Sequence, residues 1–161
     1  MTTPRARSRL VVSLAVSAMM GASIAAPFAY AQSPTHGAVR PASSALQDRM
    51  LALVNRSRQS HGLPRLRLNL RLSKEALKHS RLMARTGAIS HTSNLVDLIR
   101  GVGGTVFGED VGKGRAIVGI RDAWLRGSDT GPILLDARFH GVGLAVVHIG
   151  GFYWATLQAF N

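Results

Sequence analysis

Residues 142–160 read VGLAVVHIGGFYWATLQAF and carry the clearest secondary-structure signal in the chain. Two runs rich in β-branched and aromatic side chains, 142–147 and 152–160, flank Ile149-Gly150-Gly151, and this pattern is typical of a β-hairpin. The second run has apolar residues on both of its faces. It is therefore predicted to be a central or near-central strand.

The segments before this hairpin have the periodicity of helices. We predict four helices, bounded by Ser43 or Ser44 and Gly62, by Ser73 and Gly87, by Asn94 and Arg100, and by Arg115 and Leu125. The glycine-rich segments 101–104 and 112–114 predict turns. Because helices come first and strands last, the predicted fold class is α+β, with helices packed against a mostly antiparallel sheet.

The N-terminal 31 residues have the three parts of a secretory signal peptide. An arginine-rich start precedes an almost uninterrupted apolar run over 10–26, and Ala29-Tyr30-Ala31 has the small-x-small form of a cleavage site. We predict cleavage after Ala31, no membrane span in the mature chain, and a secreted or periplasmic location. An uncleaved N-terminal anchor is the alternative.

Cleavage of the 31 residues would leave 130 of the 161, which is enough for one domain with a sizeable core. Residues 32–43 predict a flexible leader, because they are rich in Ser, Pro and other small or polar residues. The folded domain is predicted to span 44–161, and we expect a monomer. The sequence contains no Cys, so neither a disulfide nor a Cys-ligated zinc can stabilise it.

The chain is strongly basic, with 20 Lys and Arg against 8 Asp and Glu. Without the three arginines of the signal peptide, 17 basic residues remain and the net charge is about +9. Such a protein attracts polyanions, including an anionic component of the cell envelope; a merely solvated basic surface is the alternative. No aromatic residue is interleaved with the basic ones over 49–85, which argues against nucleic acid as the partner.

Four short segments occur in the order and spacing of a known family. They are 51–58 followed by Gly62-Leu63-Pro64, then 72–84, then Ser90-His91-Thr92-Ser93, and finally Gly108-Glu109-Asp110-Val111. They resemble the motifs LxLxNxxR…GLPxL, LsxxAxxHSxxMA, SHxS and GENI. Together with a gapless match from Trp124 to Tyr153-Trp154, they make residues 44–161 similar to the CAP superfamily (the SCP domain), in its short bacterial secreted form.

The resemblance implies a three-layer α-β-α sandwich with one cleft that carries two His and two Glu. His91 stands at the position of the first His and Glu109 at that of the first Glu. Thr130 stands where the second His would be, and the second Glu has no counterpart. His140 follows Phe139 near the same region, so it is an additional candidate for the cleft. Only two of the four residues that the resemblance implies for the cleft are therefore present.

His91 and Glu109 are the pair most suited to chemistry. A carboxylate bonded to one imidazole nitrogen fixes the tautomer and leaves the other nitrogen for a ligand or a proton. We expect the two side chains to lie within hydrogen-bonding distance, either as a ligand site or as a buried clip between two loops. Because zinc requires three or four protein ligands, we expect no metal site and no other cofactor.

Three functions are compatible with these residues. The first is a binding module that holds a lipid or another small apolar or envelope-derived ligand in the cleft. The second is an extracytoplasmic hydrolase of peptide or cell wall, with His91 as base and Glu109 as its orienting group. The third is a secreted basic protein that engages a polyanion. The incomplete tetrad favours binding over catalysis, and the sequence does not identify the ligand.

Overall fold

The computed structural model describes residues 42–161. The predicted signal peptide (1–31) and residues 32–41 of the predicted leader lie outside the described residues. The elements are α1 Ala42–Ser60, β1 Arg67–Leu68, α2 Leu70–Thr86, α3 Leu95–Arg100, β2 Phe107–Gly114, α4 Ile117–Arg126, α5 Thr130–Leu134, β3 Gly141–Ile149 and β4 Phe152–Phe160. The predicted α+β class is confirmed. None of the described helices is both long and apolar enough to cross a bilayer.

The four strands form one sheet in the order β1-β3-β4-β2. β4 is central and pairs antiparallel with both β3 and β2, as predicted for the C-terminal run. β1 pairs with β3 in parallel, because the chain returns from α1 along the start of β3: the Arg67 amide donates to the His140 carbonyl at 2.8 Å. The sheet is therefore mixed, and the prediction of a mostly antiparallel sheet is wrong.

The hairpin between β3 and β4 turns through two glycines. Gly150 and Gly151 have φ values of 62° and 75°, and Ile149 pairs with Phe152 across them. A two-residue turn with positive φ at both positions has the twist that antiparallel strands require, and glycine adopts it without steric strain. The hairpin prediction is confirmed.

β2 is a strand that the sequence did not predict. Residues 112–114 were expected to form a turn, but they pair with β4 as part of an eight-residue strand. The glycines in this strand allow helices to approach closely. A Cβ on Gly108 would lie 2.8 Å from a methyl carbon of Ile133, and one on Gly112 would lie 2.7 Å from a methyl carbon of Ile120. The glycines therefore serve packing rather than turning.

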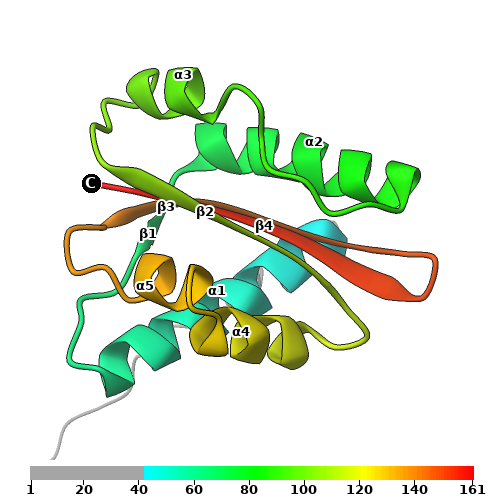
Figure 1. Cartoon of the computed structure of the whole chain (residues 1–161), viewed down its shortest axis with the longest axis horizontal. Coiled ribbons are helices and arrows are strands. Elements are labelled where there is room, and N and C mark those ends of the chain that lie inside the picture. Colours follow the sequence, from blue (N-terminus) through cyan, green and yellow to red (C-terminus); the bar gives the residue numbers. More distant parts are fainter. Residues whose placement is uncertain (1–41) are drawn as a thin grey trace, which may run out of the picture. The chain divides into compact units, whose positions relative to one another are not determined.

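Helices cover both faces of the sheet (Figure 1). α1, α4 and α5 lie on one face, where Met50, Trp124 and Leu134 pack against alternate residues of β3 and β4. α2 and α3 lie on the other face, where Met83 packs against Val147 and Trp154. The alternation of side chains along each strand supplies an apolar surface to both layers of helices.

α2 begins earlier than the sequence predicted. Asn69, not Ser73, caps the helix, because its side-chain oxygen accepts from the Leu72 amide at 3.0 Å. Ser73 instead donates to the Asn69 carbonyl at 2.7 Å and accepts from the Leu144 amide at 3.1 Å. Its hydroxyl thus ties α2 to β3. The predicted end of the helix is confirmed, since Gly87 takes the left-handed conformation with φ 74°.

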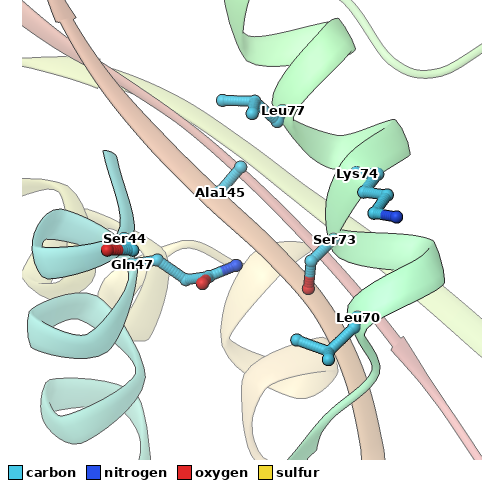
Figure 2. A pocket seen from close by; sticks show the side chains of 7 residues that line it. All are labelled: Ser44, Gln47, Leu70, Ser73, Lys74, Leu77 and Ala145. Atoms are coloured by element: carbon cyan, nitrogen blue, oxygen red, sulfur yellow. The ribbon is translucent and has the colours of Figure 1, made fainter. Parts of the chain in front are cut away.

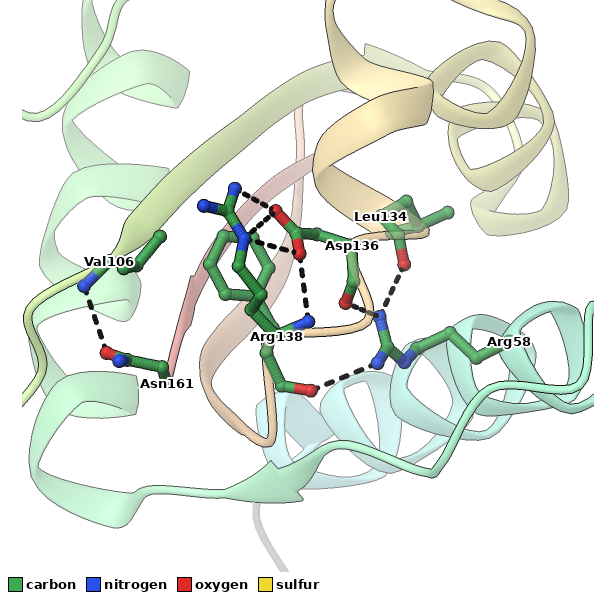
Figure 3. A network of polar contacts seen from close by, with 7 residues as sticks. Arg58, Val106, Leu134, Asp136, Arg138 and Asn161 are labelled. Atoms are coloured by element: carbon green, nitrogen blue, oxygen red, sulfur yellow. Dashed lines mark hydrogen bonds and ion pairs between the residues drawn. The ribbon is translucent and has the colours of Figure 1, made fainter.

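Arg58 joins α1 to the chain segment that precedes β3 (Figure 3). Its guanidinium is completely buried and donates to the backbone carbonyls of Pro64, Leu134, Asp136 and Phe139 at 2.9–3.0 Å. Burial lowers its pKa, and the nearby Asp136 carboxylate opposes that shift. The side chain therefore satisfies four backbone carbonyls and fixes α1 to the segment between α5 and β3.

Candidate functional site

The predicted contact between His91 and Glu109 is present. His91 lies in the loop after α2, and Glu109 points from β2 toward it, with 2.9 Å between Nδ1 and Oε1. The same oxygen accepts from the Thr92 amide at 2.8 Å, and Oε2 accepts from the Gln158 side chain at 2.9 Å. Both carboxylate oxygens are thus engaged, and the sequence-based prediction of hydrogen-bonding distance is confirmed.

These contacts keep Glu109 ionised. Burial disfavours the charged form, but hydrogen bonds from the Thr92 side chain, Gln158, the Thr92 amide and His91 outweigh it and lower the pKa of Glu109. An ionised carboxylate only accepts hydrogen bonds, so Nδ1 of His91 must carry the proton in this pair. In the neutral imidazole, Nε2 is then the free acceptor.

Two further side chains position the loop that carries His91. His79 on α2 is buried, and its Nε2 donates to the Ser90 carbonyl at 2.6 Å. Gln158 on β4 also donates to the Thr92 hydroxyl at 3.0 Å. Neither Thr92 nor Gln158 was predicted from the sequence to have this role. For Gln158, the available signal was a polar residue within an otherwise apolar, buried strand.

A groove of about 470 Å³ opens beside the exposed imidazole of His91. One wall is the outer surface of α2, and the other is the loop and α3. The residues that line it are Glu75, Lys78, His79, Leu82, Arg85, Ser90, His91, Thr92, Ser93, Asn94 and Leu98. We call this the His91 groove. It combines cationic and hydroxyl groups with two leucines.

The other two candidate residues lie apart from the His91 groove. The Thr130 hydroxyl donates to the Trp124 carbonyl at 2.7 Å on α4, so it is used in the helix layer. His140 is exposed before β3, with its ring 6.2 Å from that of Phe160. Neither residue lines the groove. The structure therefore brings together His91 and Glu109, and it does not add Thr130 or His140 to them.

A second groove lies between α1 and α2 at the edge of the sheet beside β3 (Figure 2). It has a volume of about 370 Å³ and is more apolar than the His91 groove. The residues that line it are Ser44, Gln47, Leu70, Ser73, Lys74, Leu77 and Ala145. It contains neither His91 nor Glu109. The more apolar of the two grooves is therefore not the one beside the His–Glu pair.

Zinc should bind this protein weakly. Both oxygens of Glu109 already accept hydrogen bonds, and within residues 42–161 no three His, Asp or Glu side chains gather closely enough to share a metal ion. Calorimetric titration of the mature protein with zinc should give micromolar affinity at best. A stoichiometric nanomolar site would contradict this prediction and would identify a ligand such as His140.

Asp110 follows Glu109 in β2, so its side chain points to the other face of the sheet. Its side chain is completely buried, and neither oxygen has a hydrogen-bond partner among the described residues. Burial, together with the charge of Glu109, raises the pKa of Asp110 to about 8. At neutral pH the carboxyl is therefore protonated in the folded protein, whereas it ionises near pH 4 when unfolded.

Replacing Asp110 with Asn should stabilise the protein, and more so as pH rises. A raised folded-state pKa means that stability is complete below about pH 4 and declines up to about pH 8. Asn cannot ionise, but its amide would also be buried, so we expect a net gain of about 1–3 kcal/mol at neutral pH. Thermal melts of both proteins from acidic to alkaline pH measure this. Parallel curves for variant and parent would contradict it.

The fold and the site together define an α+β domain with a His–Glu pair beside a surface groove. The family model of the cysteine-rich secretory protein family, CAP, matches residues 51–158, and the chain belongs to this family. The resemblance inferred from the four sequence segments is therefore confirmed. A search of curated proteins finds no match.

Solved structures show the same fold. An extracellular protein with an SCP domain from Bacillus anthracis is 24% identical with a TM-score of 0.65, over 74% of this chain and 41% of its own. An outer surface protein from Borrelia burgdorferi is 13% identical with a TM-score of 0.65, over 73% and 92%. A cysteine-rich secretory protein from Staphylococcus aureus is 18% identical with a TM-score of 0.61, over 75% and 40%. This chain therefore spans less than half of the Bacillus and Staphylococcus proteins.

Proposed function

We propose that this chain is an exported binding module whose His91 groove holds a small envelope-derived amphiphile with an anionic group. The observation that carries the proposal is the contrast within the His–Glu pair. The side chain of Glu109 is 2% exposed and that of His91 is 68% exposed. A buried, ionised carboxylate thus fixes an imidazole that faces solvent, and such an arrangement is suited to contacting a ligand.

The groove offers both kinds of contact that an amphiphile needs. Lys78 and Arg85 project from the outer face of α2, where Lys78 pairs with Glu75 at 2.8 Å. Lys78 and Arg85 supply donors for an anionic headgroup, and Nε2 of His91 can accept a hydrogen bond from a protonated oxygen of that headgroup. Leu82 and Leu98 supply apolar surface in the same groove. An exposed Leu is ordinary on its own, but here it lies within a concave site.

A hydrolase with His91 as general base is the competing function. It requires a nucleophile or a bound water at Nε2 of His91, with a further group to stabilise the oxyanion. Glu109 can orient His91 for that task, but its two oxygens already accept hydrogen bonds from His91, Thr92 and Gln158. Binding requires only the contacts already described, so the geometry supports it better.

The test combines native mass spectrometry of the purified mature protein with calorimetric titration of dodecyl phosphate. We expect a co-purifying amphiphile in the spectrum. Arg85→Gln and His91→Ala should each weaken dodecyl phosphate binding about tenfold, as expected for the loss of one hydrogen bond to the headgroup. Arg81→Gln removes an exposed arginine of the same helix that does not line the groove, and it should bind normally.

Equal affinity in Arg85→Gln and Arg81→Gln would refute the proposed headgroup site. Turnover of a peptide or cell-wall substrate that is lost in His91→Ala would establish the hydrolase instead. Export is tested separately by N-terminal sequencing of the protein recovered outside the cytoplasm. The expected first residue is Gln32, and a product that retains residues 10–26 would mean an anchored protein.

A further inference from the structure

The end of the molecule at the β3–β4 turn combines fixed cations with exposed apolar side chains. Lys113 Nζ lies 4.5 Å from the ring centre of Phe152 and 4.4 Å from that of Trp154, and the guanidinium of Arg115 lies 4.8 Å from that of Phe152. Ile149 pairs with Phe152 across the turn and is 43% exposed. None of these contacts belongs to the His91 groove.

Ile89, which is 53% exposed, extends this surface. It lines a groove of about 410 Å³ together with Lys113 and Arg115, so the loop after α2 meets the β2–α4 connection there. Figure 1 shows the β3–β4 turn, the C-terminal end of α2 and the β2–α4 connection at the same end of the domain. We call Ile89, Lys113, Arg115, Ile149 and Phe152 the hairpin-end surface.

The charged residues of the segments around this surface are all basic. The three segments that form it, residues 81–96, 111–121 and 137–161, contain no Asp or Glu. Its two cations are exposed, and the aromatic rings beneath them fix their positions by cation–π contacts. This arrangement matches the interface of a bilayer. The fixed cations suit the anionic headgroups, and the exposed isoleucines and the half-buried aromatic ring suit the acyl chains just beneath them.

We propose that the hairpin-end surface docks the exported protein on an anionic lipid bilayer. The charge complementarity favours an anionic partner, and the exposed isoleucines favour a bilayer over a soluble polyanion, which offers no apolar region to bury them. Docking inserts Ile89 beneath the headgroups, and Ile89 lies two residues from His91. The proposal stands whether or not the His91 groove binds an amphiphile, because the two sites use different residues.

The test is co-sedimentation of the mature protein with vesicles of equal parts phosphatidylglycerol and phosphatidylcholine. We expect salt-sensitive binding to these vesicles and none to phosphatidylcholine alone. The double variant Lys113→Gln/Arg115→Gln should bind about 30-fold more weakly, at about 1 kcal/mol for each cation near the surface. Ile149→Ser should bind roughly tenfold more weakly, because one large apolar side chain no longer inserts.

The matched controls remove the same kinds of side chain from another part of the surface. Arg65→Gln/Arg67→Gln removes two exposed cations at β1, and Leu70→Ser removes an apolar side chain that is 70% exposed. Both should bind as the parent does, and all variants should keep the parent's melting temperature to within a few degrees. These results, together with the losses at the hairpin-end surface, would support docking there.

Several results would overturn the proposal. Equal losses in the β1 control would mean diffuse charge attraction, and undiminished binding of Ile149→Ser would mean that no side chain enters the bilayer. Binding to neutral vesicles with equal strength, or no binding to anionic ones, would remove the docking surface altogether. Dextran sulfate binding that is lost in Lys113→Gln/Arg115→Gln, together with vesicle binding by Ile149→Ser as strong as the parent's, would identify a soluble polyanion as the partner.

Discussion

Removal of residues 153–161 should abolish folding of the whole domain. These residues form nearly all of β4, which lies between β3 and β2 and bonds to both. They include Trp154, Leu157 and Phe160, all buried. Burying each such side chain is worth roughly 1.5–3 kcal/mol, against a typical total stability of about 5–15 kcal/mol. Circular dichroism of the truncated protein should show no cooperative thermal transition.

A shorter truncation provides the control. Asn161 alone lies beyond β4, and its side chain accepts from the amides of Thr105 and Val106 at 2.8 and 2.9 Å (Figure 3). Deleting only Asn161 should lower the melting temperature by several degrees while a sharp transition remains. If the longer truncation also kept a sharp melt near the parent's midpoint, β4 would be peripheral and the described sheet would be incorrect.

Arg58→Ala should have the second-largest effect, a loss of about 3–5 kcal/mol in the free energy of unfolding. The variant leaves buried carbonyls without donors and opens a cavity between α1 and the segment before β3. Arg58→Lys should recover little, because an ammonium has three donors and cannot reproduce the planar geometry of the guanidinium. Urea denaturation with extrapolation to water measures both variants.

Arg56→Ala is the matched control, since Arg56 lies on the same helix but is exposed. Its effect on stability should stay within about 0.5 kcal/mol. Similar losses in Arg56→Ala and Arg58→Ala would show that the loss of any arginine from α1, rather than of the buried guanidinium, determines the effect. The description of Arg58 as the link between α1 and the segment before β3 would then be wrong.

The parts of the fold that the sequence predicted are those with a strong local pattern. The β3–β4 hairpin has apolar strands around a Gly-Gly turn, and the ends of α2 and α3 have glycines. β2 was missed because its glycines at 108, 112 and 114 are typical of loops, whereas here they make room for Ile133 and Ile120. β1 has two residues and pairs with a strand about 75 positions away, so no local signal identified it.

The candidate site was predictable in part for a different reason. Neither His91 nor Glu109 stands out by local chemistry, and the resemblance to a family selected both. Gln158 and Thr92, which complete the bonds of Glu109, come from a distant strand and from the loop itself. One wall of the His91 groove is the outer, polar side of α2. In the sequence, a helix face that binds a ligand there has the same kinds of residues as a face that only contacts water. Only the tertiary structure distinguishes them.

The most direct test of the proposed function is a two-dimensional NMR titration of the mature protein with dodecyl phosphate below its micellar concentration. We predict saturable amide shifts along residues 90–94 and on the outer face of α2 from Lys78 to Arg85, with a smaller response in His91→Ala. Shifts confined to the α1–α2 groove around Leu70 and Leu77, or no saturable shift anywhere, would contradict the assignment of the His91 groove as the ligand site.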